Sequence, residues 1–72
     1  MKCELANLNT GWFQMYLRVR PDEIPNLVSA LQALTDGSHF HLGSNHRDTA
    51  GVADIEISLQ GSDESDNMRV LL

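Results

Sequence analysis

The run WFQMYLRVR at residues 12–20 alternates between two sets of side chains more strictly than any other part of the chain. One of these sets is Phe13, Met15, Leu17 and Val19. Because successive side chains of a strand point to opposite faces of the sheet, this spacing predicts a strand with one apolar face. β-branched and aromatic residues suit that setting.

Other segments predict partner strands for this one. Residues 2–8 form a mixed run, and NTG at residues 9–11 is a turn signal that predicts a hairpin with the next strand. Residues 38–43 (SHFHLG) and 52–60 (VADIEISLQ) also alternate as strands do. The closing MRVLL, residues 68–72, is expected to add a short strand to a sheet edge or to a second subunit.

One helix is predicted over residues 22–35. Its apolar residues recur at spacings of three and four, namely Ile24, Leu27, Val28, Leu31 and Leu34. Asp22 is the expected N-cap, which places Pro25 in the first turn, where no intrahelical hydrogen bond is lost. Gly37 stands where a left-handed C-cap glycine is expected.

These elements predict an α+β fold in the order β-β-α-β-β, with a possible fifth strand. One helix cannot cover both faces of the sheet, so it should pack on the apolar face. That face would contain Phe13, Met15, Leu17, Phe40, Leu42, Ile55 and Ile57. The expected architecture is a two-layer sandwich, with a mostly antiparallel sheet of four to five strands. Residues 1–72 form a single domain, in which residues 61–67 are a flexible acidic loop.

Length and cysteine content limit how such a domain can be stabilised. A chain of 72 residues buries only about 60% of its unfolded surface, so extra support is common. A disulfide within the chain is impossible because Cys3 is the only cysteine. Oligomerisation or a metal ion remains as the available support.

The net charge and the hydropathy of the chain limit the classes of partner that it can bind. The net charge of −5 disfavours nucleic acid and favours encounter with a basic protein. No run approaches the roughly 20 apolar residues that span a membrane, and MKCELANLNT lacks the apolar region of a signal peptide. We therefore expect a cytoplasmic protein with no membrane or nucleic-acid partner. No Gly-rich phosphate loop is present, and no cofactor is expected.

Alternation predicts what the second face of the sheet contains. Its members would be Trp12, Tyr16, His39, His41, Asp54 and Glu56. This prediction depends on three separate strand registers, since a slip of one residue moves a whole set to the other face. Tryptophan and tyrosine are enriched in protein interfaces. The aromatics could cover the sheet edge, form a homodimer face or bind a different protein.

All three histidines lie in SHFHLGSNH, residues 38–46. His39 and His41 would point to the same side of a strand, with about 7 Å between their Cα atoms. That geometry can chelate a metal, and His46, Asp48, Asp54 or Glu56 could complete a zinc shell. An H-x-H pair alone is also common on surfaces without any ion, so both interpretations stay open.

Catalytic patterns are sparse. Cys3 with a histidine could form a nucleophile–base pair, and Asp54 with Glu56 could form an acid–base pair. Nothing near Cys3 in sequence orients it, and two carboxylates on an exposed strand are usually just solvated. A chain this short has little room for an ordinary pocket, so an enzyme site would have to form between subunits.

The segments PDEIPNLVSALQAL, SHFHL and VADIEISL resemble small immunity proteins of bacterial polymorphic toxin systems. The resemblance covers residues 21–59. It implies a small, acidic, cytoplasmic protein without catalysis, which binds a toxin and blocks it, with SHFHL in the toxin-facing or subunit-facing surface. The sequence thus predicts a non-catalytic, homodimeric protein-binding module. The alternatives are a histidine-based metal-binding domain and a small enzyme with a site between subunits.

Overall fold

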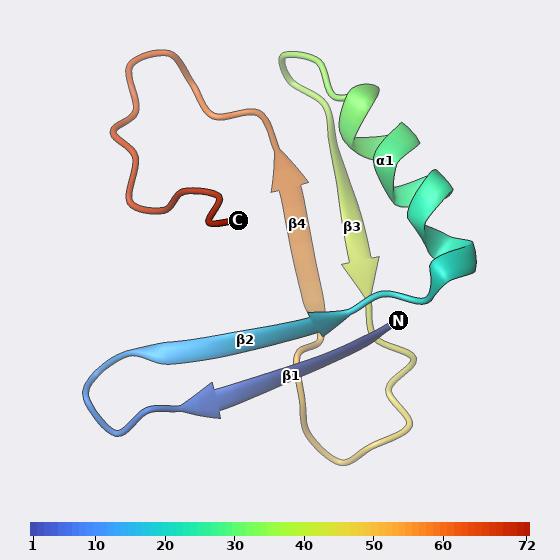
Figure 1. The fold of residues 1–72 in the computed structure, drawn as a ribbon, viewed down its shortest axis with the longest axis vertical. Helices are drawn as coiled ribbons and strands as arrows, with labels where there is room; N and C mark the ends of the chain where they lie inside the picture. The colour runs from blue at the N-terminus through green and yellow to red at the C-terminus, as the bar shows by residue number, and fades with distance from the viewer.

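The computed structural model describes all 72 residues and contains four strands and one α-helix (Figure 1). In chain order, the elements are β1 (Lys2–Asn7), β2 (Phe13–Arg18), the 3₁₀ turn η1 (Pro21–Glu23), α1 (Ile24–Gln32), β3 (His39–Gly43) and β4 (Asp54–Ser58). The α+β class and the predicted β-β-α-β-β order are confirmed. No helix is long and apolar enough to cross a membrane.

The strands form two separate antiparallel pairs, β1–β2 and β3–β4. The predicted single sheet of four to five strands is therefore not present within one chain. Figure 1 shows the reason, because the two hairpins run crosswise and their edges do not lie parallel. Strands that cross cannot exchange ladder hydrogen bonds. Residues 68–72 form no strand, so the possible fifth strand is absent as well.

The first hairpin closes through the predicted turn. Asn9 and Gly11 both have positive φ, at 57° and 92°, which is the backbone conformation that such a turn requires. The Leu8 N–H donates to the Trp12 carbonyl at 3.1 Å, and the Asn9 N–H donates to Oδ1 of Asn7 at 2.8 Å. These bonds fix the pairing of β1 with β2.

The helix begins differently from the prediction. The first turn is 3₁₀ and starts at Pro21, so Asp22 lies inside it and is not an N-cap. Instead, the Glu23 carboxylate accepts the Arg20 backbone N–H at 3.0 Å. The Asp22 carboxylate pairs with Nε of Arg20 at 3.2 Å. Arg20 is therefore the N-cap of this first turn, two residues before the predicted one, and Pro21 fixes φ at the first position after it.

The helix also ends earlier than residue 35, with Ala33 as its C-cap. Gly37 does have a positive φ of 79°, but it belongs to a separate turn. In that turn the Ser38 N–H donates to the Thr35 carbonyl at 3.0 Å, and the Thr35 N–H donates to Oγ of Ser38 at 2.8 Å. These local hydrogen bonds replace the last predicted turn of helix.

Apolar packing is partial. In β3–β4 the apolar face is half-buried and consists of Phe40, Leu42, Ile55 and Ile57. Figure 1 draws α1 next to β3, and the least exposed residues of α1, Leu27 and Ala30, lie on one helical face. The half-burial of these four strand side chains is the closest that the chain comes to a core.

The first hairpin has no such cover. Its apolar face, here called the hairpin apolar face, consists of Leu5, Phe13, Met15 and Leu17. All four side chains are exposed, and Phe13 is 60% exposed. The helix therefore does not cover the whole apolar surface that the sequence assigned to it.

The chain is open in shape. It exposes 6686 Å², whereas a compact monomer of this mass exposes about 4,500 Å². Its radius of gyration is 14.2 Å, compared with about 11 Å for a compact domain of this length. No residue is fully buried.

Candidate functional site

The polar face of β3–β4 gathers imidazoles and carboxylates from both strands. We call His39, His41, Asp54 and Glu56 the histidine–carboxylate cluster. The strand register sets it, because His41 lies directly opposite Glu56 and Gly43 lies opposite Asp54. Alternation then places the four side chains on the face opposite Phe40 and its apolar neighbours.

Asp54 holds the ring of His41. Nδ1 of His41 lies 3.0 Å from Oδ1 and 2.9 Å from Oδ2 of the carboxylate. A carboxylate can only accept, so Nδ1–H donates and the lone pair of this imidazole is on Nε2. The Asp54 contact therefore selects the tautomer and the ring orientation of His41.

The free nitrogens converge on Glu56. Oε1 of Glu56 lies 3.7 Å from Nε2 of His41 and 3.9 Å from Nε2 of His39. The two rings meet edge to face, with centroids 4.9 Å apart. One ligand atom from each of these three residues lies within 4.8 Å of the others. The cluster thus offers two nitrogen donors and one oxygen donor to a single point.

His46 does not join this group, which corrects its place among the metal candidates. It lies in the loop at residues 44–53 with a positive φ of 56°. Its backbone N–H donates to Oγ of Ser44 at 3.0 Å, which fixes a local turn rather than a ligand position. The third donor is Glu56, one of the carboxylates that the sequence offered.

No family model, characterised protein or solved structure matches the chain.

Function must therefore be inferred from the surfaces themselves. Of the six residues predicted to share one face, Trp12 and Tyr16 lie on the first hairpin, apart from the four in the cluster. Trp12 follows the turn and is 75% exposed. Tyr16 lies on the polar face of β2, where its hydroxyl donates to Oε1 of Gln14 at 3.0 Å.

The sequence did not identify the hairpin apolar face as a candidate site, because it assigned Phe13, Met15 and Leu17 to the core. Their alternation was visible, but their lack of cover was not. On α1, Ile24, Val28 and Leu31 are exposed as well. Large contiguous apolar patches on soluble proteins are typical of interaction sites. Cys3 lies at the margin of this surface, opposite Leu17, as a half-buried free thiol.

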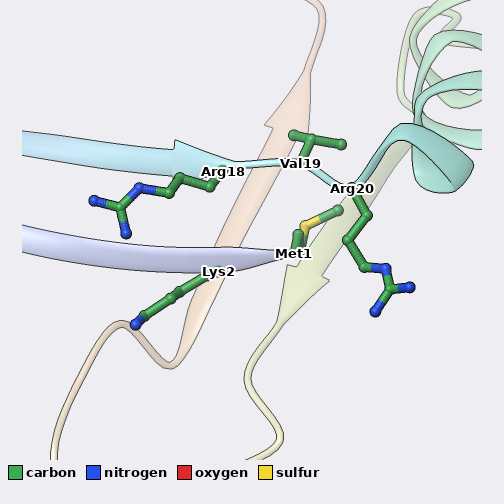
Figure 2. Close-up of a pocket in the computed structure, with 5 residues that line it drawn as sticks. All are labelled: Met1, Lys2, Arg18, Val19 and Arg20. Atoms are coloured by element: carbon green, nitrogen blue, oxygen red, sulfur yellow. The ribbon is translucent and has the colours of Figure 1, made fainter.

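Figure 2 shows a shallow cavity of about 350 Å³ where β1 begins and β2 ends, lined by Met1, Lys2, Arg18, Val19 and Arg20. Its three cations are already paired. Glu4 contacts Lys2 at 3.1 Å and Arg18 at 3.4 Å, and Asp22 contacts Arg20 at 3.2 Å. Each cationic side chain of the cavity thus has an acidic partner, but Lys2 and Arg18 share a single carboxylate.

Two carboxyl groups near this cavity have lowered pKa values. A hydrogen bond from Lys2, followed by the charges of Lys2 and Arg18, lowers the pKa of Glu4. The pKa of Glu23 is lowered by its hydrogen bond with the N-terminal ammonium group, 2.6 Å away, and by the Arg20 backbone N–H. Both effects favour the charged form of the carboxyl group, and both come from contacts within the first hairpin or around η1.

Proposed function

We propose that this chain is a non-catalytic protein-binding module that works as a homodimer. One observation carries the proposal: the chain is 42% hydrophobic, yet a single copy fully buries no residue. Hydrophobic burial is the main favourable term in folding. A chain that cannot bury its own apolar surface must bury it against another molecule.

The exposed area matches a second copy of the chain. One chain exposes 6686 Å², which is about 2,200 Å² more than a compact monomer of the same mass. Two chains that each covered this excess would bury about 4,400 Å² in total. Obligate homodimers bury roughly 2,000–5,000 Å². The missing burial is thus of the size that a permanent dimer supplies.

The hairpin apolar face is the surface that the second copy would cover. A two-stranded hairpin is at best marginally stable in water and needs more strands or a packed layer. A second copy of the chain would supply the additional strands or the packed layer. In the dimer, the partner copy would cover the hairpin apolar face as a second layer.

The dimer leaves polar surface for a second protein. Trp12, Tyr16 and the histidine–carboxylate cluster remain the contact residues that we propose for it. The net charge of −5 favours a basic partner, since opposite charge speeds encounter. This role agrees with the resemblance of residues 21–59 to immunity proteins, which implies an inhibitor that binds and blocks a toxin.

Light scattering tests the dimer. The wild type is expected to have a mass of about 16 kDa, twice the 8.0 kDa of one chain. Its melting temperature should rise with protein concentration, because association stabilises the folded state by mass action. Phe13→Glu places a charge on the hairpin apolar face and should lower the mass to that of one chain.

Gln14→Glu is the matched control. It adds the same charge at the next position of β2, on the opposite face of the hairpin. This variant should keep the mass of the wild type. A wild type that is folded and monomeric at every concentration would refute the homodimer, and so would equal effects of the two variants.

A further inference from the structure

We infer that the histidine–carboxylate cluster binds one divalent cation of the zinc type. The ligands are Nε2 of His39, Nε2 of His41 and Oε1 of Glu56, and Asp54 is a positioning residue. This inference goes beyond the proposed function, because it requires neither the homodimer nor a partner protein.

The distances fit a site that small side-chain rotations would complete. Zinc bonds to nitrogen and oxygen are about 2.0–2.2 Å long, so ligand atoms around a tetrahedral ion lie about 3.4 Å apart. Here two separations are 3.7 and 3.9 Å, and all three ligand atoms lie within 4.8 Å of one another. The three side chains are 46–56% exposed and can turn without moving the backbone.

The backbone is already arranged for binding. His41 and Glu56 are directly opposite in the β3–β4 ladder, and His39 is two residues before His41 on the same face. Directly opposite residues of an antiparallel pair have Cβ atoms about 5 Å apart. The sheet thus brings two ligands from β3 and one from β4 together before any ion arrives.

Asp54 supplies an independent observation. Metal-bound histidines almost always donate their second ring N–H to a carboxylate, a carbonyl or water, which fixes the tautomer. The Asp54 carboxylate accepts from Nδ1 of His41 at 2.9 Å, which leaves Nε2 as the donor toward a metal. An arrangement of this kind orients a ligand in addition to pairing charges.

The charges and donor types select the ion. Neither Asp54 nor Glu56 is paired with a lysine or arginine in the structure, so no strong cation competes with a metal ion for their oxygens. Two imidazoles with one carboxylate favour zinc-type ions over Mg²⁺ and Ca²⁺, which prefer oxygen ligands. Three protein ligands leave the fourth position to water.

Calorimetric titration of metal-free protein with ZnCl₂ at neutral pH tests this site. The wild type should bind one Zn²⁺ per chain, and His41→Ala should lose that binding. Asp54→Asn keeps all three ligands and should bind about 10- to 100-fold more weakly. His46→Ala removes a neighbouring histidine outside the cluster and should bind like the wild type.

Circular dichroism and light scattering on the same samples separate the two proposals. His41→Ala must keep the wild-type spectrum and mass, so that its lost binding reports the site and not the fold. A wild type that binds no Zn²⁺ at micromolar concentration overturns the inference, and so does His41→Ala that binds normally or His46→Ala that loses binding. Unchanged affinity in Asp54→Asn overturns its positioning role. None of these results depends on whether the chain is a dimer.

Discussion

The two hairpins have the same design and different surroundings. Each is an antiparallel pair with one apolar and one polar face. On β3–β4, Phe40 and its apolar neighbours are half-buried, and α1 is drawn beside β3 (Figure 1). On β1–β2, the corresponding aromatic residue, Phe13, is 60% exposed. The exposure of their apolar side chains therefore distinguishes the hairpins more than their composition does.

The polar faces of the two hairpins differ in which groups pair with their carboxylates. On the first hairpin, Lys2 and Arg18 both pair with Glu4, so one carboxylate serves two strong cations within β1–β2. On the second, the acids Asp54 and Glu56 meet imidazoles and no strong cation. The first hairpin thus offers an apolar contact surface, and the second offers a polar one. We assign the homodimer to the former and the metal to the latter.

The largest expected effect in this comparison comes from removing one aliphatic side chain from each apolar face. Ile57→Ala should destabilise the chain by about 2 kcal/mol, at the low end for a buried aliphatic side chain, because Ile57 is only half-buried. Leu5→Ala should weaken the dimer by roughly tenfold to a hundredfold.

Thermal unfolding at several protein concentrations separates these two losses. The effect of Leu5→Ala should shrink as concentration rises, because the lost contacts are between chains. The effect of Ile57→Ala should persist at every concentration. The same concentration dependence in both variants would mean that the hairpins do not differ in what covers them.

A smaller effect is expected at the glycines of the two hairpins. Gly11 has a φ of 92°, so Gly11→Ala should cost about 1 kcal/mol by straining the β1–β2 turn. Gly43 has no positive φ, and a Cβ built there would meet nothing within 4 Å. Gly43→Ala should therefore be neutral in urea denaturation. Equal losses in the two variants would contradict the turn geometry.

The smallest effect concerns pH. Because Lys2 and Arg18 lower the pKa of Glu4 below its ordinary value of 4.5, the carboxylate stabilises the folded chain above that pH. This stabilisation is lost as pH falls through the lowered folded-state pKa. Glu4→Gln should therefore be slightly less stable than the wild type at neutral pH and equally stable in strong acid.

Denaturant midpoints across this pH range provide the measurement. Asp36→Asn is the control, because it removes the same charge from a residue without a recorded ion pair. A pH profile of Glu4→Gln that matches the wild type would show that the Glu4 contacts do not contribute to stability.

Local patterns in the sequence predicted local structure well. Alternation in residues 12–20 and the turn at residues 9–11 predicted the first hairpin. Alternation also predicted that His39 and His41 share a face, as they do. The prediction of Asp22 as an N-cap is wrong, because a 3₁₀ turn begins at Pro21 and Asp22 lies inside it. The predicted helix began only one residue later, at residue 22.

Long-range arrangement was beyond the sequence. Whether two hairpins join edge to edge or cross depends on contacts between residues far apart in the chain, and alternation has no information on them. The pairing of His41 with Glu56 is similarly a contact across the loop at residues 44–53, whose length does not fix a register. For that reason the sequence favoured His46 as the further metal candidate and offered Asp48, Asp54 and Glu56 only as other possible ligands.

The register of β3 with β4 also constrains how this segment can evolve. In β3 and in β4, residues of the apolar face alternate with residues of the histidine–carboxylate cluster. The two surfaces are therefore interleaved along the sequence. A single-residue insertion within Asp54–Ser58 would exchange them, and both would be lost in one step. Insertions in residues 44–53 would leave both intact. Length variation should therefore accumulate in that loop, which is also the place to insert a tag or a reporter.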